Sequence, residues 1–155
     1  MPVVADAGTT GSSTSTIAST AKPAPSTSSL RGHLADAGRC VDQAGTIPAV
    51  RCAIGGVDVE FELVGATVAA AYRRATGSTP RPRTGAPTCA SGRPDERSWA
   101  RVAAPSRVIG RYTCEIARGH AEMWWSDDHG ILAHAVAPDT DLAALFTWWL
   151  RHPAE

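Results

Sequence analysis

Residues 57–63 read VDVEFEL, in which apolar and acidic side chains alternate without a break. Successive side chains of a strand point to opposite faces, so this alternation predicts a strand with one buried and one solvated face. The two residues before it, Gly55 and Gly56, are typical of a two-residue hairpin turn. The partner strand is therefore expected at residues 49–53, and an antiparallel sheet is expected at the centre of the fold.

A helix is predicted after this hairpin. Val68, Ala71, Tyr72 and Ala75 recur at the spacing of one helix face, and Gly77 suits the position just past the helix end. The Pro- and Arg-rich segment that follows, residues 78–107, is predicted to be a long connection with a short element around residues 99–103.

The carboxyl-terminal part of the chain repeats this order of elements. Strands are predicted at residues 111–116, 121–126 and 131–137, and a closing helix carries an apolar stripe of Leu142, Leu145, Phe146 and Trp149. A shift of 74 residues (57 to 131, 68 to 142) maps the first strand and stripe onto the second. This register suggests a duplicated β-β-α unit, although two short amphipathic elements can also match by chance. We expect an α+β fold with one antiparallel sheet and both helices packed on one face.

The amino-terminal region has a different character. Residues 1–32 are predicted to form a disordered tether, because positions 9–29 are rich in Ser, Thr and Pro and contain one strong hydrophobe, Ile17. Residues 33–155 are predicted to form a single α+β domain. Fifteen basic and fifteen acidic residues cancel, so no nucleic-acid partner is expected. No apolar run reaches the roughly 18 residues of a membrane span, so this chain is not expected to insert into a membrane.

Four cysteines stand at Cys40, Cys52, Cys89 and Cys114, none of them in a C-x-x-C pair. The even count predicts two disulfides and hence an oxidising, extracytoplasmic location; four buried free thiols are the alternative. Of the three connectivities, Cys40–Cys52 and Cys89–Cys114 are favoured because each closes a short loop. Residues 1–8 lack the features of a signal peptide. Either an export signal lies upstream of this sequence, or the cysteines are reduced.

No motif of a known catalytic mechanism is present. The chain has no G-x-S-x-G elbow, no P-loop and no H-E-x-x-H helix, so we expect neither an enzyme nor a cofactor. Two groups leave a binding role open. Asp127, Asp128, His129 and His134 suggest a metal site, with a solvated turn as the favoured reading. Asp58, Glu60 and Glu62 could bind a cation or a basic partner, but the favoured interpretation is the solvent-exposed face of a sheet.

Two tryptophan pairs are the most unusual feature, Trp124-Trp125 in a predicted strand and Trp148-Trp149 in the closing helix. One ring of each pair is expected in the core, namely Trp149 and either Trp124 or Trp125. Exposed aromatic rings often mark recognition surfaces. The candidate binding surface is therefore formed by Trp124, Trp148, Asp127 and Asp128, with an unknown ligand or protein partner.

A series of short motifs runs through residues 38–150 in a distinctive order. They are Val50-Arg51-Cys52, Phe61, Ala70-Ala71-Tyr72, Gly110-Arg111-Tyr112-Thr113-Cys114, Trp125-Ser126-Asp127-Asp128 and Trp148-Trp149. This order resembles a C-terminal extracytoplasmic module of actinobacterial Ser/Thr protein kinases and related secreted or lipoprotein-like proteins. The resemblance implies a non-catalytic module that is tethered through a Ser/Thr/Pro linker to a membrane helix and a kinase, neither of which this sequence contains.

The expected function is accordingly that of an extracytoplasmic binding or sensor-type module, linked through the resemblance to Ser/Thr kinase signalling. It would be secreted, or tethered to a membrane through a segment that this chain lacks. The alternative is a small intracellular protein-interaction or inhibitor protein.

Overall fold

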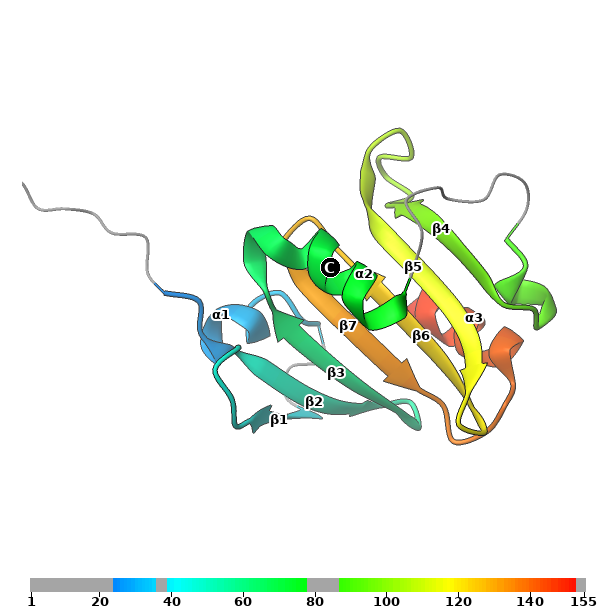
Figure 1. Ribbon diagram of the computed structural model, residues 1–155, viewed down its shortest axis with the longest axis horizontal. Coiled ribbons are helices and arrows are strands. Elements are labelled where there is room, and N and C mark those ends of the chain that lie inside the picture. The colour runs from blue at the N-terminus through cyan, green and yellow to red at the C-terminus, as the bar shows by residue number, and fades with distance from the viewer. Residues whose placement is uncertain (1–23, 36–38, 78–86, 153–155) are drawn as a thin grey trace, which may run out of the picture.

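A single antiparallel sheet with helices on both faces forms the fold (Figure 1). The computed structural model describes residues 24–35, 39–77 and 87–152. The elements are α1 (Thr27–Arg31), β1 (Cys40–Gln43), β2 (Ala49–Ile54), β3 (Val57–Leu63), η2 (Gly65–Thr67), α2 (Val68–Thr76), η3 (Cys89–Ser91), β4 (Asp95–Ala100), β5 (Val108–Ala117), β6 (His120–Ser126), β7 (Ile131–Val136) and α3 (Leu142–Arg151). The seven strands follow the order β1-β2-β3-β7-β6-β5-β4. The predicted α+β class is confirmed.

The hairpin that organises the sheet has the predicted register. Ile54 pairs with Val57 across Gly55 and Gly56, whose φ angles of 58° and 83° lie in the left-handed region. Glycine adopts this region without steric cost, so the tight turn needs both residues. Residues of β3 alternate between buried and exposed over most of its length, as the sequence pattern predicted.

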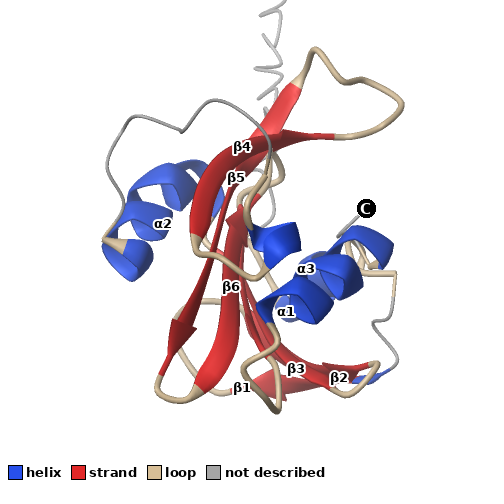
Figure 2. Cartoon of the chain, turned by 90° about the vertical axis from the view of Figure 1, so that its right-hand side faces the viewer, coloured by secondary structure: helices blue, strands red, loops and turns tan. Residues whose placement is uncertain are grey.

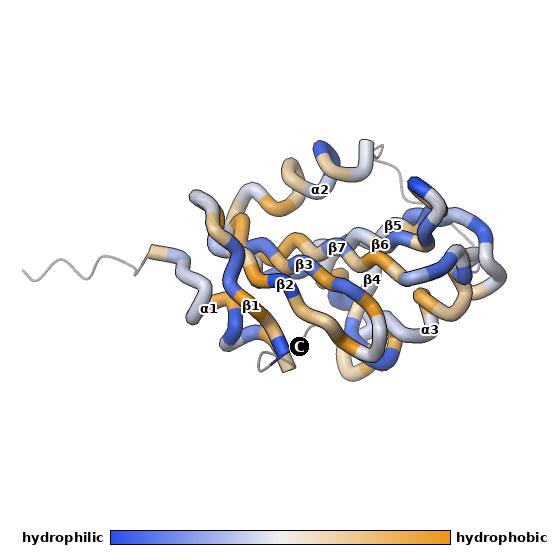
Figure 3. The backbone as a smooth tube through the Cα atoms, turned by 90° about the horizontal axis from the view of Figure 1, so that it is seen from below, coloured by the Kyte–Doolittle hydropathy of each residue, from blue (hydrophilic) through white to orange (hydrophobic). Residues whose placement is uncertain are grey.

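The sheet has two faces, and hydrophobic and hydrophilic residues follow one another along its strands (Figure 3). We call the face that carries Val59, Met123, Trp125 and Ala133 the core face; α1 and α3 cover it. We call the opposite face, which carries Glu60, Trp124, Leu132 and His134, the outer face; α2 covers part of it. Figure 2 shows α2 on one side of the sheet and α1 and α3 on the other.

The expectation that α2 and α3 share one face is therefore wrong. The physical reason lies in β6 and β7, where Met123 and Trp125 are buried on the core face and Leu132 is buried on the outer face. Strands that are buried on both faces read as continuous apolar runs rather than as alternation. These central strands need cover on both sides, and α2 supplies it on the outer face.

The same finding limits the proposed duplication. The order strand, strand, helix does occur twice, as β2-β3-α2 and as β6-β7-α3. Because the two helices leave their hairpins toward opposite faces, the two units diverge in direction. The structure does not support a duplicated rigid unit.

The ordered domain begins earlier than the predicted boundary at residue 33. Ser26 caps α1 by accepting a hydrogen bond from the Ser29 amide, and Leu30 is 0% exposed within the core cluster. Arg31 forms an ion pair of 2.7 Å with Asp42 of β1. Burial of Leu30 offsets the entropy of ordering this short segment. The rest of the predicted tether, residues 1–23, lies outside the described residues.

Both predicted disulfides are present. Cys40–Cys52 joins the neighbouring strands β1 and β2, and Cys89–Cys114 joins η3 to β5. The two bridges leave no free cysteine. Disulfides persist in oxidising compartments, which are extracytoplasmic in most organisms. Among the helices of the described ranges, none has the length and apolar character that crossing a membrane requires.

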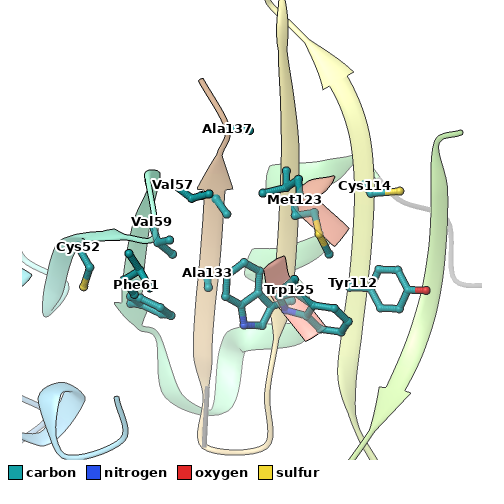
Figure 4. Packing of buried hydrophobic residues seen from close by; sticks show 14 of the residues in the cluster. Cys52, Val57, Val59, Phe61, Tyr112, Cys114, Met123, Trp125, Ala133 and Ala137 are labelled. Atoms are coloured by element: carbon teal, nitrogen blue, oxygen red, sulfur yellow. The ribbon is translucent and has the colours of Figure 1, made fainter. Parts of the chain in front are cut away.

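A chain of aromatic rings runs through the core face. Figure 4 shows Trp125 at the centre of the sheet, with Phe61 on one side and Tyr112 on the other. Trp125 lies edge-on to Phe61 at 5.9 Å and to Trp149 at 6.2 Å. Trp125 and Trp149 are buried whereas Trp124 and Trp148 are half-buried, so the prediction for the two tryptophan pairs is confirmed.

Candidate functional site

A hollow lies between β4 and the carboxyl-terminal half of α3. Its volume is about 490 Å³, which lies in the range of small-molecule sites. We call this hollow the aromatic groove. Its ring-bearing walls are formed by Trp99, Tyr112, Phe146 and Trp149.

Local periodicity explains which side of its own element each of these rings occupies. Phe146 and Trp149 belong to the apolar stripe of α3, while Trp99 and Tyr112 lie on β4 and β5 with their side chains on the core face. Trp149 contacts Tyr112 at 4.9 Å and Trp99 at 5.6 Å between ring centroids. Such edge-on and tilted contacts are favourable for aromatic pairs. The walls of the aromatic groove are therefore continuous with the core.

Trp99 is held in place by a contact that spans a strand. Its indole Nε1 donates a 2.8 Å hydrogen bond to the carbonyl oxygen of Ser126 on β6. The residue beneath is Gly110 of β5, where an added Cβ would lie 1.8 Å from the same oxygen. Only glycine allows this close approach. The orientation of one wall of the aromatic groove thus depends on Gly110.

Exposed apolar side chains gather at the margin of the aromatic groove. Val102 is 99% exposed and Leu150 is 59% exposed, and both line it. Val108, also exposed, pairs with the lining residue Ala100. Contiguous exposed apolar surface is unfavourable in water and commonly marks an interaction site.

The charged groups of the lining are cationic. Arg97 is ion-paired at 2.5 Å with Asp95, whose side chain is fully buried, whereas Arg101 is exposed at the loop after β4. Burial raises the pKa of Asp95, but hydrogen bonds from the Thr88 amide, from Arg97 and from the Glu96 amide outweigh it and leave the pKa below its ordinary value. Asp95 is therefore a structural carboxylate that orients Arg97.

The residues of the predicted binding surface do not come together. Trp124 lies on the outer face, stacked on His134 at 3.9 Å and packed beside α2. Trp148 belongs to α3 on the core side, where its indole donates a hydrogen bond of 2.9 Å to the Ile54 carbonyl. These two rings are thus on opposite faces. The structure therefore does not bring Trp124 and Trp148 together into one surface.

Asp127 and Asp128 also have structural contacts. Asp127 is 3% exposed, and its Oδ1 accepts hydrogen bonds from the amides of His129 and Ile131 in the β6–β7 turn. Burial raises the pKa of Asp127, although these two amides oppose the shift. Asp128 is exposed and forms an ion pair with Arg107.

A second, much smaller hollow of about 80 Å³ lies on the outer face. It is lined by Glu60, Glu62, Trp124, Leu132 and His134. Burial and the neighbouring Glu60 raise the pKa of Glu62, while His134 is hydrogen-bonded to Glu122 at 2.8 Å. Over the described ranges, no three His, Cys, Asp or Glu side chains gather in an arrangement that could hold a metal ion.

Sequence reasoning missed the aromatic groove, although it placed a short element near residues 99–103. The observed strand, β4, covers residues 95–100 and is thus slightly earlier. The available signal was Trp99 itself, a large ring in a segment otherwise rich in Pro and Arg. Its partners on α3 are about fifty positions away in the sequence, so no local pattern joins them.

Comparison of the chain with family models, with curated proteins and with solved structures finds no match. The functional interpretation therefore depends on the geometry of the aromatic groove and on the disulfides.

Proposed function

We propose that this chain is a non-catalytic binding module of an extracytoplasmic compartment, and that its ligand binds in the aromatic groove. The observation that carries the proposal is the coincidence of a four-ring hollow of about 490 Å³ with the exposed side chains of Val102 and Leu150. An apolar partner would cover surface that is now exposed to water, which is favourable by roughly 25 cal/mol for each Å² buried.

The chemistry of the walls favours an apolar ligand over a sugar. Recognition of a sugar requires several polar groups that converge on its hydroxyls, in addition to an aromatic platform. Here the indole N–H of Trp99 is already bonded to Ser126, and Arg97 is engaged with Asp95. Arg101 remains exposed at the margin, so an apolar body with an anionic end would be complementary.

Two observations support the cellular context. The disulfides favour an oxidising compartment over the intracellular alternative. The order of motifs resembles modules that stand outside the membrane in actinobacterial Ser/Thr kinases, which supports a sensor-type role. In this proposal the domain is secreted or tethered outside the membrane, and ligand binding is its contribution to signalling.

The anionic fluorophore 1-anilinonaphthalene-8-sulfonate tests the binding site, because it combines aromatic rings with one negative charge. Its titration against the oxidised domain should show saturable fluorescence enhancement. Val102→Asp and Leu150→Gln should each weaken binding about fivefold or more, since each removes apolar contact with the dye.

Matched controls use apolar residues that are exposed elsewhere. Val41→Asp on β1 and Ile116→Gln on β5 change similarly exposed side chains outside the lining of the aromatic groove. They should leave dye binding within about twofold of the parent protein. Equal loss in all four variants, or no saturable binding to the parent, would overturn the assignment of the aromatic groove as the ligand site.

A further inference from the structure

The outer edge of β4 borders the aromatic groove. Within the part of the chain that the structure describes, β4 is the last strand of the sheet and pairs with β5 alone. Edge strands present main-chain donors and acceptors that can pair with another strand. The question is which residues of β4 direct those groups outward.

Two hydrogen bonds settle the direction. The Arg111 amide on β5 bonds the Ser126 side chain, so it faces β6 and not β4. Its cross-strand partner Ser98 therefore belongs to a pair that does not share ladder hydrogen bonds. Glu96 lies two residues earlier and has the same direction, because its amide donates a hydrogen bond to the Asp95 side chain rather than to β5. The main-chain groups of Glu96 and Ser98 thus point away from the sheet.

Ser98 is the exposed centre of this edge. Its side chain is exposed, and the direction of the Arg111 amide places the main-chain N–H and C=O of Ser98 on the open side of β4. Ser98 also lines the aromatic groove, and its neighbour Trp99 forms one of the walls. Along β4, main-chain groups that could pair with an added strand therefore lie next to a hollow that could accept apolar side chains.

We infer that the ligand of the aromatic groove is an extended peptide that pairs with the outer edge of β4 and inserts alternate apolar side chains into the groove. Pairing by an added strand uses main-chain hydrogen bonds for affinity and pockets for every second side chain for specificity. The inference depends on the proposed function, since it names the class of ligand for the same site.

Charge complementarity narrows the peptide further. The aromatic groove has Arg101 exposed at its margin, and Arg151 follows the lining residue Leu150. The two acidic side chains of β4 are both engaged in ion pairs, Asp95 with Arg97 and Glu96 with Arg111. The preferred peptide therefore carries acidic residues next to its apolar positions.

A synthetic peptide with the sequence Thr-Val-Thr-Leu-Thr-Val-Asp-Glu, acetylated and amidated at its ends, tests the inference by calorimetry. Two N-methylated forms keep every side chain. One is methylated at the second and third Thr, the other at the Leu and the second Val. Residues opposite each other in a sheet share a face, and successive residues of a strand direct their amides to opposite edges.

One methylated peptide should therefore bind about tenfold or more weakly, while the other binds within about twofold of the parent peptide. Loss of affinity in the peptide methylated at Thr indicates antiparallel pairing, because the Thr side chains would then share the outer face with Ser98. Loss of affinity in the peptide methylated at Leu and Val indicates parallel pairing. Equal affinities for both forms, equal losses in both, or no binding of the parent peptide overturns the inference.

The protein side is tested by Ser98→Pro, with Ser98→Ala as its matched control. Proline removes the outward amide without breaking the β4–β5 ladder, and alanine retains it. Ser98→Pro should bind the parent peptide at least about tenfold more weakly, and Ser98→Ala within about twofold. If the fluorophore binds the aromatic groove but the peptides fail, the proposed function stands and the edge pairing falls. If the fluorophore also fails, both fall.

Discussion

The indole nitrogen of Trp99 on β4 donates its hydrogen bond to the carbonyl oxygen of Ser126 on β6, 2.8 Å away, over the intervening strand β5. This contact ties three strands together and sets one wall of the aromatic groove. It is made across Gly110, whose missing side chain leaves room for the indole. Stability and binding geometry are therefore coupled at one position.

Gly110→Ala should destabilise the domain by roughly 2–4 kcal/mol, because the new Cβ overlaps the Ser126 carbonyl. Urea unfolding measures this change, and dye binding should weaken as Trp99 is displaced. Gly45→Ala is the control, since its Cβ would lie 3.8 Å from the nearest atom, the Ile47 carbonyl oxygen. Equal stability of the two variants would contradict the close approach.

Leu30→Ala should lower the free energy of unfolding by roughly 2–4 kcal/mol, because Leu30 is fully buried under the core face. A chain that begins at residue 33 should lose at least as much. Val41→Ala, at a side chain that is 63% exposed, should change stability by less than about 0.5 kcal/mol. If the shortened chain kept full stability, α1 would not belong to the folded domain.

Replacing each cysteine pair by alanine should cost about 3 kcal/mol for Cys40–Cys52 and slightly more for Cys89–Cys114, which spans 25 residues rather than 12. Thermal unfolding of the two double variants shows which disulfide contributes more to stability. In the native protein without reductant, alkylation should modify no cysteine, and after denaturation and reduction it should modify four. Four reactive thiols in unreduced material would remove the basis of the extracytoplasmic assignment.

Asp95→Asn should cost roughly 3 kcal/mol at pH 7, because it removes the buried carboxylate that pairs with the guanidinium of Arg97. The folded pKa of Asp95 is lowered from the roughly 3.9 of an unfolded aspartate. Its stabilisation is therefore fully present above about pH 4 and is lost as the pH falls through the folded pKa. Urea midpoints between pH 2 and pH 7 should converge for parent and variant at the acid end; a constant difference would contradict the ion pair.

Asp127→Asn should show the opposite trend with pH. Burial raises the folded pKa of Asp127, so stabilisation by its protonated form is present below about pH 4 and is lost as the pH rises through the folded pKa. The neutral amide retains an oxygen for the His129 and Ile131 amides. Urea unfolding should show the variant gaining stability relative to the parent as pH rises from 4 to 7. If the variant instead gained stability relative to the parent as the pH fell, the buried carboxyl of Asp127 would not be the cause of the pH dependence.

The hairpin, the helix stripes and the two disulfides were predictable because each depends on neighbours close in sequence. VDVEFEL specifies its buried face through a period of two, and Gly55-Gly56 specifies its turn. Cys40 and Cys52 lie on adjacent strands of the same local unit, at positions directly opposite each other. Local geometry therefore carries this information without reference to the rest of the chain.

Two features were decided only by tertiary structure. The first is the face that each helix covers, because the apolar stripes of α2 and α3 look alike and do not specify a face by themselves. The second is the aromatic groove, whose walls Trp99 and Trp149 belong to elements that no sequence pattern connects. Periodicity specifies that a side chain is buried, whereas its partner depends on the free energy of packing the whole chain.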